Sequence, residues 1–302
     1  MGLCLAGCTV PIEDSQTSAI RGGTTDDGDP AVVALSVLGV YSYCTATLIA
    51  PKTILTAGHC VLTGMEADFG TDADNPTQSI DVKTSVRHPM YSALGAPYDF
   101  ALLQLASAPT GVRPIALDGA ALGEADLGRT IRHVGYGVTD DSTSAGGGTR
   151  RTVSYTINKI DGMLVYSGAQ GEQTCTGDSG GPGLVMTGAG EVIATVTSDG
   201  PDCQLSQDGW DDRVDLVQDW IVATVSMWDT PPTFVADASS GSNAGSASGS
   251  GGSSDGTADS GADSAGGCSA TRSSAAWLAL VVVPFARRRR VRSRLVGGPI
   301  PG

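Results

Sequence analysis

Three residue types in this 302-residue sequence together have the chemistry of nucleophilic hydrolysis. A serine hydroxyl attacks when a neighbouring imidazole takes its proton and a carboxylate orients that imidazole. The sequence has only three histidines, so few residues can act as the base. His59 follows a strand-like apolar run, and Asp99 precedes another. Ser179 lies in a glycine-rich turn whose backbone N–H groups can converge on an anion.

Short apolar runs, separated by Gly, Pro, Asp and Asn, must position these residues. They are residues 31–37, 45–50, 100–105 and 192–197. Val153, Tyr155 and Ile157 alternate with polar residues, which indicates a strand. Many short strands with turns between them predict an all-β barrel or sandwich. One helix is expected near the end of this region, from apolar residues at helical spacing: Val214, Val217, Ile221 and Val225, with Trp220 bordering the same face.

Three motifs occur in an order that resembles the chymotrypsin/trypsin-like serine proteases. They are Thr56–Cys60 (TAGHC), Asp99–Leu103 (DFALL) and Gly177–Pro182 (GDSGGP). Further similar segments are Ile20–Gly23 (IRGG), His88–Tyr91 (HPMY), Gly135–Gly137 (GYG) and Gly209–Ile221. The resemblance covers residues 20–226. It implies two antiparallel six-stranded β-barrels with a C-terminal helix, within a protease domain that we place at residues 20–228.

The resemblance also implies a role for each reacting group. Ser179 is expected to be the nucleophile, His59 the general base and then acid, and Asp99 the carboxylate that orients His59. The backbone N–H groups of Gly177 and Ser179 are expected to form the oxyanion hole. The resemblance implies no cofactor. The other two histidines, His88 and His133, match structural positions.

Seven cysteines indicate the compartment and the cross-links: Cys4, Cys8, Cys44, Cys60, Cys175, Cys203 and Cys268. They include no CxxC pair, which argues against a structural zinc site. Four lie in the predicted domain and can form two disulfides, which persist in exported proteins. The resemblance pairs Cys44 with Cys60 and Cys175 with Cys203.

Activation follows from the same resemblance. A cleavage before Ile20 is expected to free an amine that pairs with the Asp178 carboxylate and orders the oxyanion loop. Residue 19 is alanine, so the activating protease is expected to differ from those that cut after Lys or Arg.

The specificity pocket departs from the pattern of members that cut after Lys or Arg. Those members carry an aspartate six residues before the nucleophile, whereas this sequence has Gln173. A neutral amide does not neutralise a buried cation, which costs several kcal/mol to leave unpaired. The pocket wall is expected at Ser198, Asp199 and Gly200, and either Asp199 or Asp202 is an alternative source of negative charge. We predict no strict preference for Lys or Arg.

The charge distribution excludes some functions. The formal net charge is −14, and residues 20–235 contain 26 acidic but only 11 basic side chains. Nucleic-acid binding needs clustered Lys and Arg, so this acidic body argues against it. Five oxygen-bearing residues cluster like calcium ligands: Glu66, Asp68, Asp72, Asp74 and Asn75. Because the loop lacks the required spacing with a closing Glu, a solvated acidic loop is preferred over a metal site.

The two ends of the sequence resemble sorting signals. Leu5–Cys8 (LAGC) resembles a bacterial lipobox, with Cys8 as the lipidation candidate, although its apolar run is short for a leader. The alternative is a terminus without a signal; in either case residues 1–19 include a pro-segment. Residues 229–267, rich in Ser, Gly, Ala and Asp, predict a disordered linker. Residues 268–302 combine Cys268, a short apolar run and an arginine cluster, and resemble the myxobacterial C-terminal sorting tag.

These observations predict an exported serine endopeptidase that is made as a zymogen and acts as a monomer on protein or peptide substrates. Its other expected partners are an activating protease and the sorting or lipidation machinery. It is expected to be secreted or held at the outer envelope of a Gram-negative bacterium, through a lipid or the tail. The alternative is a catalytically silent binding module with a protease fold at the cell surface.

Overall fold

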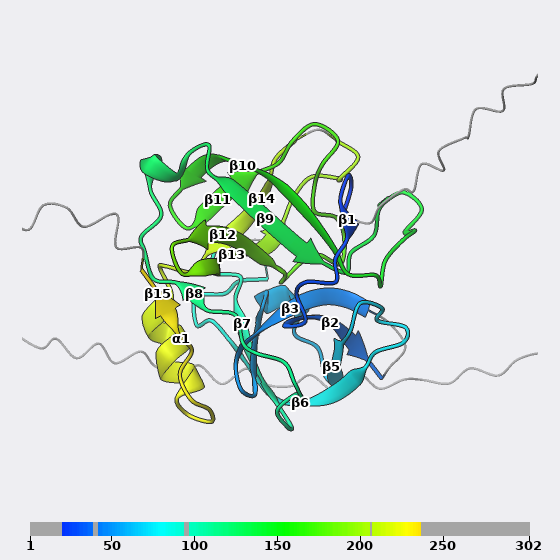
Figure 1. The fold of residues 1–302 in the computed structure, drawn as a ribbon, viewed down its shortest axis with the longest axis vertical. Coiled ribbons are helices and arrows are strands. Elements are labelled where there is room, and N and C mark those ends of the chain that lie inside the picture. Colours follow the sequence, from blue (N-terminus) through cyan, green and yellow to red (C-terminus); the bar gives the residue numbers. More distant parts are fainter. Residues whose placement is uncertain (1–19, 39–41, 94–96, 206, 237–302) are drawn as a thin grey trace, which may run out of the picture. The chain divides into compact units, whose positions relative to one another are not determined.

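Antiparallel strands make up most of the regular secondary structure in the described chain, which in this computed structural model comprises residues 20–38, 42–93, 97–205 and 207–236. These residues belong to one unit of the chain, residues 1–244. The strands are arranged in two closed rings, the first built from blue and cyan strands and the second from green and yellow ones (Figure 1).

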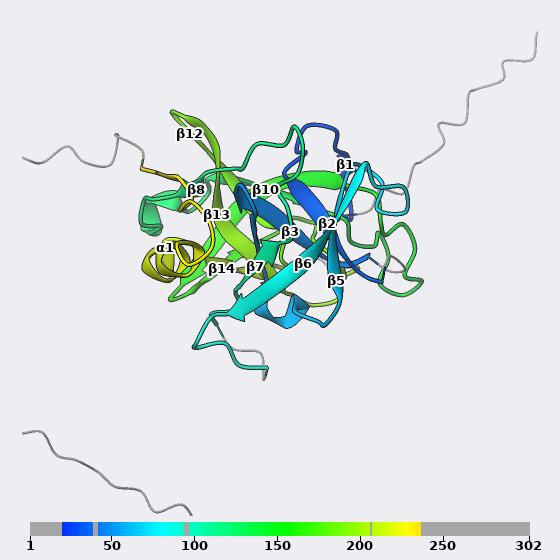
Figure 2. The same cartoon turned by 90° about the horizontal axis from the view of Figure 1, so that it is seen from below.

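The first ring has the order β2-β3-β4-β7-β6-β5. Its strands are β2 (Val32–Val37), β3 (Ser42–Ala50), β4 (Thr53–Thr56), β5 (Met65–Phe69), β6 (Gln78–Arg87) and β7 (Ala101–Leu105). The predicted apolar runs become β2, β3 and β7, whose apolar side chains point into a shared core. β4 is buried at all four positions and pairs with β7, so this central pair forms a rigid support. Figure 2 views this barrel from below.

The second ring also has six strands, in the order β12-β9-β10-β11-β14-β13, and closes through the β12–β13 pair. They are β9 (Thr130–Gly135), β10 (Arg151–Asp161), β11 (Leu164–Ser167), β12 (Pro182–Thr187), β13 (Gly190–Asp199) and β14 (Gly209–Arg213). Val153, Tyr155 and Ile157 are buried while the residues between them are exposed, as their alternation predicts. The two predicted six-stranded antiparallel barrels are therefore confirmed.

The ends of the described chain cross between the barrels. β1 (Thr24–Thr25) pairs with β10 of the second barrel, whereas helix α1 (Gln218–Val225) reaches the first (Figure 1). The Trp220 ring on α1 lies 6.5 Å from the Phe100 ring, and the Trp228 indole N–H donates to Thr53 Oγ1 at 3.0 Å. The predicted C-terminal helix is therefore present, and it anchors the strand pair β4–β7.

The region predicted as linker begins with ordered chain. β15 (Phe234–Val235) pairs with β8 (Leu117–Asp118), and its two apolar side chains are half-buried against the hydrophobic core. The lipobox-like segment with Cys8, the rest of the linker, and the tail with Cys268 lie outside the described residues. No helix in the described part is long and apolar enough to cross a bilayer.

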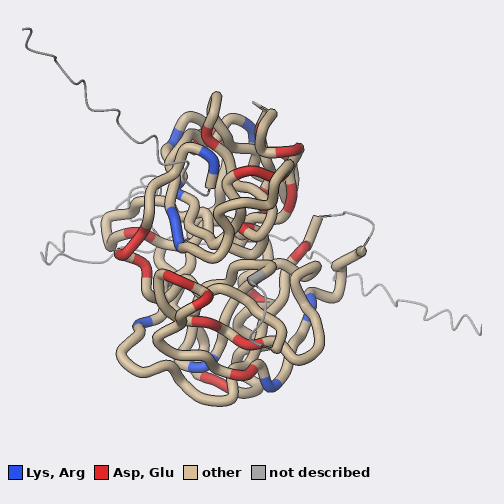
Figure 3. The backbone as a smooth tube through the Cα atoms, turned by 90° about the vertical axis from the view of Figure 1, so that its right-hand side faces the viewer, with Lys and Arg blue, Asp and Glu red and all other residues tan. Residues whose placement is uncertain are grey.

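Acidic residues are spread over both barrels, with fewer basic residues between them (Figure 3). In the loop of Asp72 to Asn75, the Asp72 carboxylate accepts bonds from the Asp74 backbone N–H and the Asn75 side-chain amide. Asp68 is instead buried and accepts a bond from the Ser79 hydroxyl. The two clusters with metal-ligand spacing in the described residues both contain disulfide sulfurs, not this loop.

Candidate active site

His59 stands at the end of the rigid strand β4. The chain leaves β4 and forms a short 3-10 turn, Gly58–Cys60, whose flanking residues are buried while the His59 side chain is 40% exposed. Cys60 is joined by a disulfide to Cys44 on β3, which ties the turn to the neighbouring strand. The imidazole is therefore held on a fixed backbone and still faces solvent.

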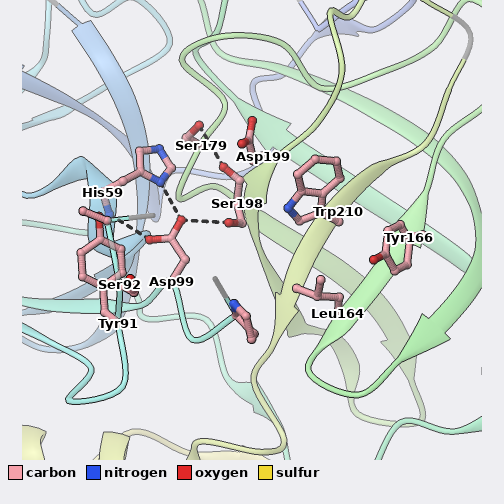
Figure 4. A pocket seen from close by; sticks show the side chains of 12 residues that line it. His59, Tyr91, Ser92, Asp99, Leu164, Tyr166, Ser179, Ser198, Asp199 and Trp210 are labelled. Carbon is pink, nitrogen blue, oxygen red and sulfur yellow. Dashed lines mark hydrogen bonds and ion pairs between the residues drawn. The ribbon is translucent and has the colours of Figure 1, made fainter. Parts of the chain in front are cut away.

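Asp99 makes two contacts with His59 from the turn that precedes β7. Its Oδ2 lies 2.6 Å from His59 Nδ1, and its Oδ1 accepts the His59 backbone N–H at 2.9 Å. The Ser198 hydroxyl donates a further bond to Asp99 Oδ2 at 2.8 Å (Figure 4). Asp99 is only 5% exposed, so these three donors replace its water shell and fix its orientation.

The hydrogen bond and opposite charges of His59 and Asp99 shift the pKa of each side chain in favour of its charged form. Burial by itself lowers the pKa of His59, but the hydrogen bond and charge of Asp99, with a contribution from Asp199, raise it above its ordinary value. Burial by itself raises the pKa of Asp99, but His59 and the Ser198 hydroxyl lower it overall. The pair therefore favours an ionised carboxylate beside an imidazole that is readily protonated.

Ser179 comes from the second barrel and faces the same cavity. It lies in the turn before β12, and its hydroxyl is 3.5 Å from the Ser198 carbonyl oxygen. Ser179, His59 and Asp99 all line one cavity of about 510 Å³ between the barrels (Figure 4). The structure thus brings together the three residues that the sequence motifs single out.

The backbone beside Ser179 presents two N–H groups. Neither the Gly177 nor the Ser179 N–H donates a hydrogen bond to another described residue. Gly177 has φ +100°, and a Cβ there would lie 2.9 Å from Gly137 Cα, so a side chain is excluded. The Thr45 hydroxyl donates to the Gly177 carbonyl at 2.9 Å, and the Thr45 N–H donates to the Ser179 carbonyl at 2.9 Å. Both carbonyls are thereby held by β3, which leaves the two N–H groups available for an anion.

Comparison with known proteins agrees with this geometry. The sequence model of the family described as Trypsin matches residues 20–221. This chain belongs to the trypsin family. Trypsin 5G1 of Aedes aegypti is 28% identical over 244 residues, covering 73% of this chain and 84% of that protein. Trypsin-1 of Salmo salar is 26% identical over 74% of this chain and 97% of that protein. Glucanase inhibitor protein 3 of Phytophthora infestans is 26% identical over 72% and 87%.

The trypsin-family chain has both predicted disulfides, Cys44–Cys60 and Cys175–Cys203. The second joins the segment before Ser179 to the loop after β13, on the far side of the specificity pocket. At the level of the family, the chain is a serine peptidase that takes peptide substrates. Its disulfides are consistent with an extracellular location.

The two residues predicted to act in activation are both buried. The Asp178 carboxylate accepts backbone N–H bonds from Gly137 and Cys175, each at 2.8 Å. No cation pairs with it among the described residues, and burial raises its pKa to about 7. Ile20 packs in the core of the second barrel. Residues 1–19 still precede it, and no bond joins Ile20 to Asp178 among the described residues.

Gln173, the residue that the sequence predicts at the base of the specificity pocket, is buried and does not itself line either cavity that contains Ser179. Neither polar atom of its amide has a hydrogen-bond partner among the described residues. Its Nε2 lies 3.1 and 3.3 Å from the positions that a Cβ would take at Gly209 and Gly200, so these glycines leave room for the amide. A buried amide without partners is costly.

A second cavity of about 560 Å³ adjoins Ser179 and is acidic. The predicted wall residues Ser198, Asp199 and Gly200 line it, together with Asp202. Asp141 also lines it, and sequence reasoning missed this residue. Its carboxylate accepts the backbone N–H groups of Thr176 and Cys203, at 3.2 and 3.1 Å, and so links the two sides of the pocket.

Other contributors to the site carry no sequence motif. Trp210 on β14 lies opposite Asp199 on β13, and its ring is 6.4 Å from the Tyr166 ring, so the two form an aromatic wall of the first cavity (Figure 4). Ser198 was predicted as pocket wall, and its hydroxyl additionally binds Asp99. The only signal for Trp210 is its place in a predicted strand, which does not say which cavity it faces.

The remaining histidines occupy packed positions. His88 stacks on Tyr98 at a ring distance of 5.0 Å and meets Trp220 edge-on, and burial lowers its pKa. His133 is buried in the second barrel, with Nε2 2.8 Å from an Asp211 carboxylate oxygen. Neither lines the cavities that contain Ser179.

Proposed function

We propose that this protein is a serine endopeptidase that cleaves peptide bonds through an acyl-enzyme on Ser179. The observation that carries the proposal is the 2.6 Å contact between His59 and buried Asp99 in the cavity that also contains Ser179. The Ser179 hydroxyl turns from the Ser198 carbonyl toward His59 Nε2, which takes its proton during attack on the substrate carbonyl. Asp99 keeps the imidazole oriented and stabilises the imidazolium.

The Gly177 and Ser179 N–H groups bind the oxyanion that develops on the substrate carbonyl oxygen. His59 then gives its proton to the leaving amine, and the acyl group stays on Ser179. Water enters, His59 accepts one of its protons, and attack on the ester releases the carboxylic acid and restores the Ser179 hydroxyl. The raised pKa of His59 supports this role, because it favours transient storage of the proton.

We further propose that the protein is a zymogen activated by cleavage before Ile20. The new amine then pairs with Asp178, whose buried carboxyl group has only backbone N–H partners among the described residues of the uncut chain. Such an ion pair removes the cost of burying an isolated carboxylate and so stabilises the loop that holds Gly177 and Ser179.

For the specificity pocket, we propose that the protein prefers substrates with an uncharged side chain immediately before the cleaved bond. Buried Gln173 offers an amide rather than a carboxylate at the pocket base. Asp199 and Asp202 lie nearer the mouth and are exposed. Hydrolysis of a peptide library by the protein beginning at Ile20 measures this preference. Cleavage mainly after Lys or Arg would reject the proposal and assign recognition to Asp199 or Asp202.

We propose that the protein works as a monomer outside the cytoplasm. The two disulfides support export, and the Cys8 and Cys268 segments are the candidates for processing or lipid attachment. Cleavage before Ile20 would release any lipid on Cys8 from the protease domain, so the C-terminal tail would then be the remaining anchor.

A fluorophosphonate probe tests the catalytic proposal directly, because it reacts rapidly only with a serine activated by a base. We expect the protein cut before Ile20 to be labelled and Ser179→Ala to be unlabelled. Ser154→Ala, at an exposed position on β10, is the matched control and should label like the wild type. Equal labelling of the wild type and Ser179→Ala would contradict the assignment of the nucleophile.

The alternative is a catalytically silent binding module. It is favoured by one observation, the similarity to a protein named a glucanase inhibitor, which suggests that this fold also serves in binding. A folded protein, cut before Ile20, that neither reacts with the probe nor cleaves any library peptide would support this alternative.

A further inference from the structure

A second carboxyl group lies directly beneath Asp99. Asp212 is a residue of β14 and is completely buried. Backbone pairing fixes it on both sides, since it lies opposite Leu164 on β11 and Val196 on β13. An acidic side chain in a fully paired central strand has little freedom to move, and burying it is costly unless hydrogen bonds or an opposite charge compensate it.

Asp212 binds the backbone of the turn that presents Asp99. Its Oδ1 accepts the Tyr98 N–H at 2.7 Å, and its carboxyl group also accepts the Asp99 N–H. Tyr98 has φ +73°, a conformation that a non-glycine residue rarely adopts. The Phe100 N–H bonds to the Tyr98 carbonyl at 2.9 Å, which closes the turn around Asp99. A strained, tight turn needs such external bonds to persist.

The surroundings of Asp212 are short of positive charge. The acids that act on it are Asp99 from the turn and Asp211 from its own strand. Its neighbour Arg213 is bound instead by Asp215. On the side of the turn, His88 stacks on Tyr98, and His59 lies beyond Asp99.

Protonation of Asp212 is set mainly by this burial. Its Oδ2 has no hydrogen-bond partner among the described residues. Burial raises the pKa of Asp212 to about 7, with Asp99 and Asp211 adding to the rise. The group therefore changes charge in the same pH range in which an imidazole base works.

We propose that Asp212 is a positioning residue that holds the Tyr98–Asp99 backbone and, through Asp99, sets the orientation and basicity of His59. It contacts neither the cavity nor Ser179. The kinetic consequence rests on the proposed peptidase function, whereas the effect on the His59–Asp99 pair does not.

The test is NMR titration of His59 in the full-length chain carrying Ser179→Ala, which removes self-cleavage. Asp212→Asn keeps an oxygen acceptor for the turn but removes the charge. We expect it to retain the His59 Nδ1–H resonance and to lower the pKa of His59 by about half a unit or more, because a negative charge near the imidazolium is lost. Asp219→Asn, an exposed change of equal charge on α1, is the control and should leave that pKa unchanged.

Asp212→Ala removes the acceptor as well, so we expect its His59 Nδ1–H resonance to shift or broaden. A wild-type resonance in Asp212→Ala together with an unchanged His59 pKa in Asp212→Asn would overturn the proposal. If Asp212→Ala does not fold, the titration of Asp212→Asn decides alone: a lowered pKa supports the proposal and an unchanged one rejects it.

Kinetics of the cut protein then give a separate readout. In Asp212→Ala we expect kcat to fall about tenfold with KM within about twofold, and Asp212→Asn to recover most of the loss. The acid limb of kcat/KM should move to lower pH in Asp212→Asn. If the cut wild-type protein shows no turnover, the proposed function is rejected. The NMR titration still tests the role of Asp212 in that case.

Discussion

The two barrels prepare the candidate active site in different ways. The first barrel supplies His59 and Asp99 from positions next to the buried strands β4 and β7, and the two side chains already bind each other. The second supplies Ser179 from a glycine-rich turn. Nearby, Asp178 has two backbone N–H bonds but no counter-charge among the described residues, and the Gln173 amide has no hydrogen-bond partner there.

This difference suggests that folding alone completes the half of the site that holds the base. Under the proposed function, the half that holds the nucleophile depends on partners: an amine for Asp178 and a substrate side chain for Gln173. Buried polar groups without partners cost stability, so they are retained where another group completes them. Control of the enzyme is therefore expected in the second barrel.

The largest expected effect tests whether the two halves act as one unit. Ser179→Ala, His59→Ala and the double variant should each lower kcat by about 10⁴-fold or more, and the double variant should be no worse than either single one. Steady-state kinetics of the protein cut before Ile20 measures this. If the loss of kcat in the double variant equals the product of the losses in the two single variants, the residues from the two barrels act independently.

The next effect addresses the dependence of the second barrel on an amine. In the cut protein, Asp178→Asn should lower kcat/KM by about a hundredfold or more, because the buried amine loses its counter-charge. The uncut chain should be nearly inactive with or without this change. Equal activity of the cut wild type and cut Asp178→Asn would refute the activation proposal.

A smaller effect tests the bonds between the barrels. Thr45→Val removes the hydroxyl that bonds to the Gly177 carbonyl and accepts the Tyr136 N–H, so we expect about 1–3 kcal/mol lower unfolding free energy and a lower kcat. Thr47→Val on the same strand is the control, since the buried Thr47 hydroxyl has no hydrogen-bond partner within the described part of the chain. It should be neutral or stabilising in urea unfolding. Similar losses in both variants would mean that the Thr45 bonds have no special role.

The smallest effect is the pH dependence of stability in the uncut chain. The pKa of Asp178 is raised from 3.8 to about 7 in the native protein. Between these values the native state binds a proton that the unfolded chain has lost, so stability falls as pH rises from about 4 to about 7. Asp178→Asn should remove its share of this slope, so that Tm falls less steeply between about pH 4 and about pH 7 than in the wild type. Thermal unfolding across this range measures it, and an unchanged slope would contradict the raised pKa.

Apolar runs and alternation predicted the strands and the C-terminal helix, whereas the two-barrel architecture and both disulfide pairings came from the family resemblance that the motifs carry. The apolar runs of β2, β3 and β7 have a strand period and lie next to the motif residues, so local sequence carried the information. No comparable sequence signal marks the roles of Thr45, Asp141, Trp210 or Asp212. Each acts through a partner distant in the chain, such as the 114-residue separation between Asp212 and Tyr98.

The sequence by itself determined which residue types are present for hydrolysis and the order in which they occur. It also determined that Gln173, not an acid, stands six residues before Ser179. Only the tertiary structure decided that Asp99 lies between His59, Ser198 and the backbone bound by Asp212, and that three further carboxylates line the second cavity. The physical reason is that barrel closure sets which strands become neighbours, and burial then sets the charge of the groups enclosed between them.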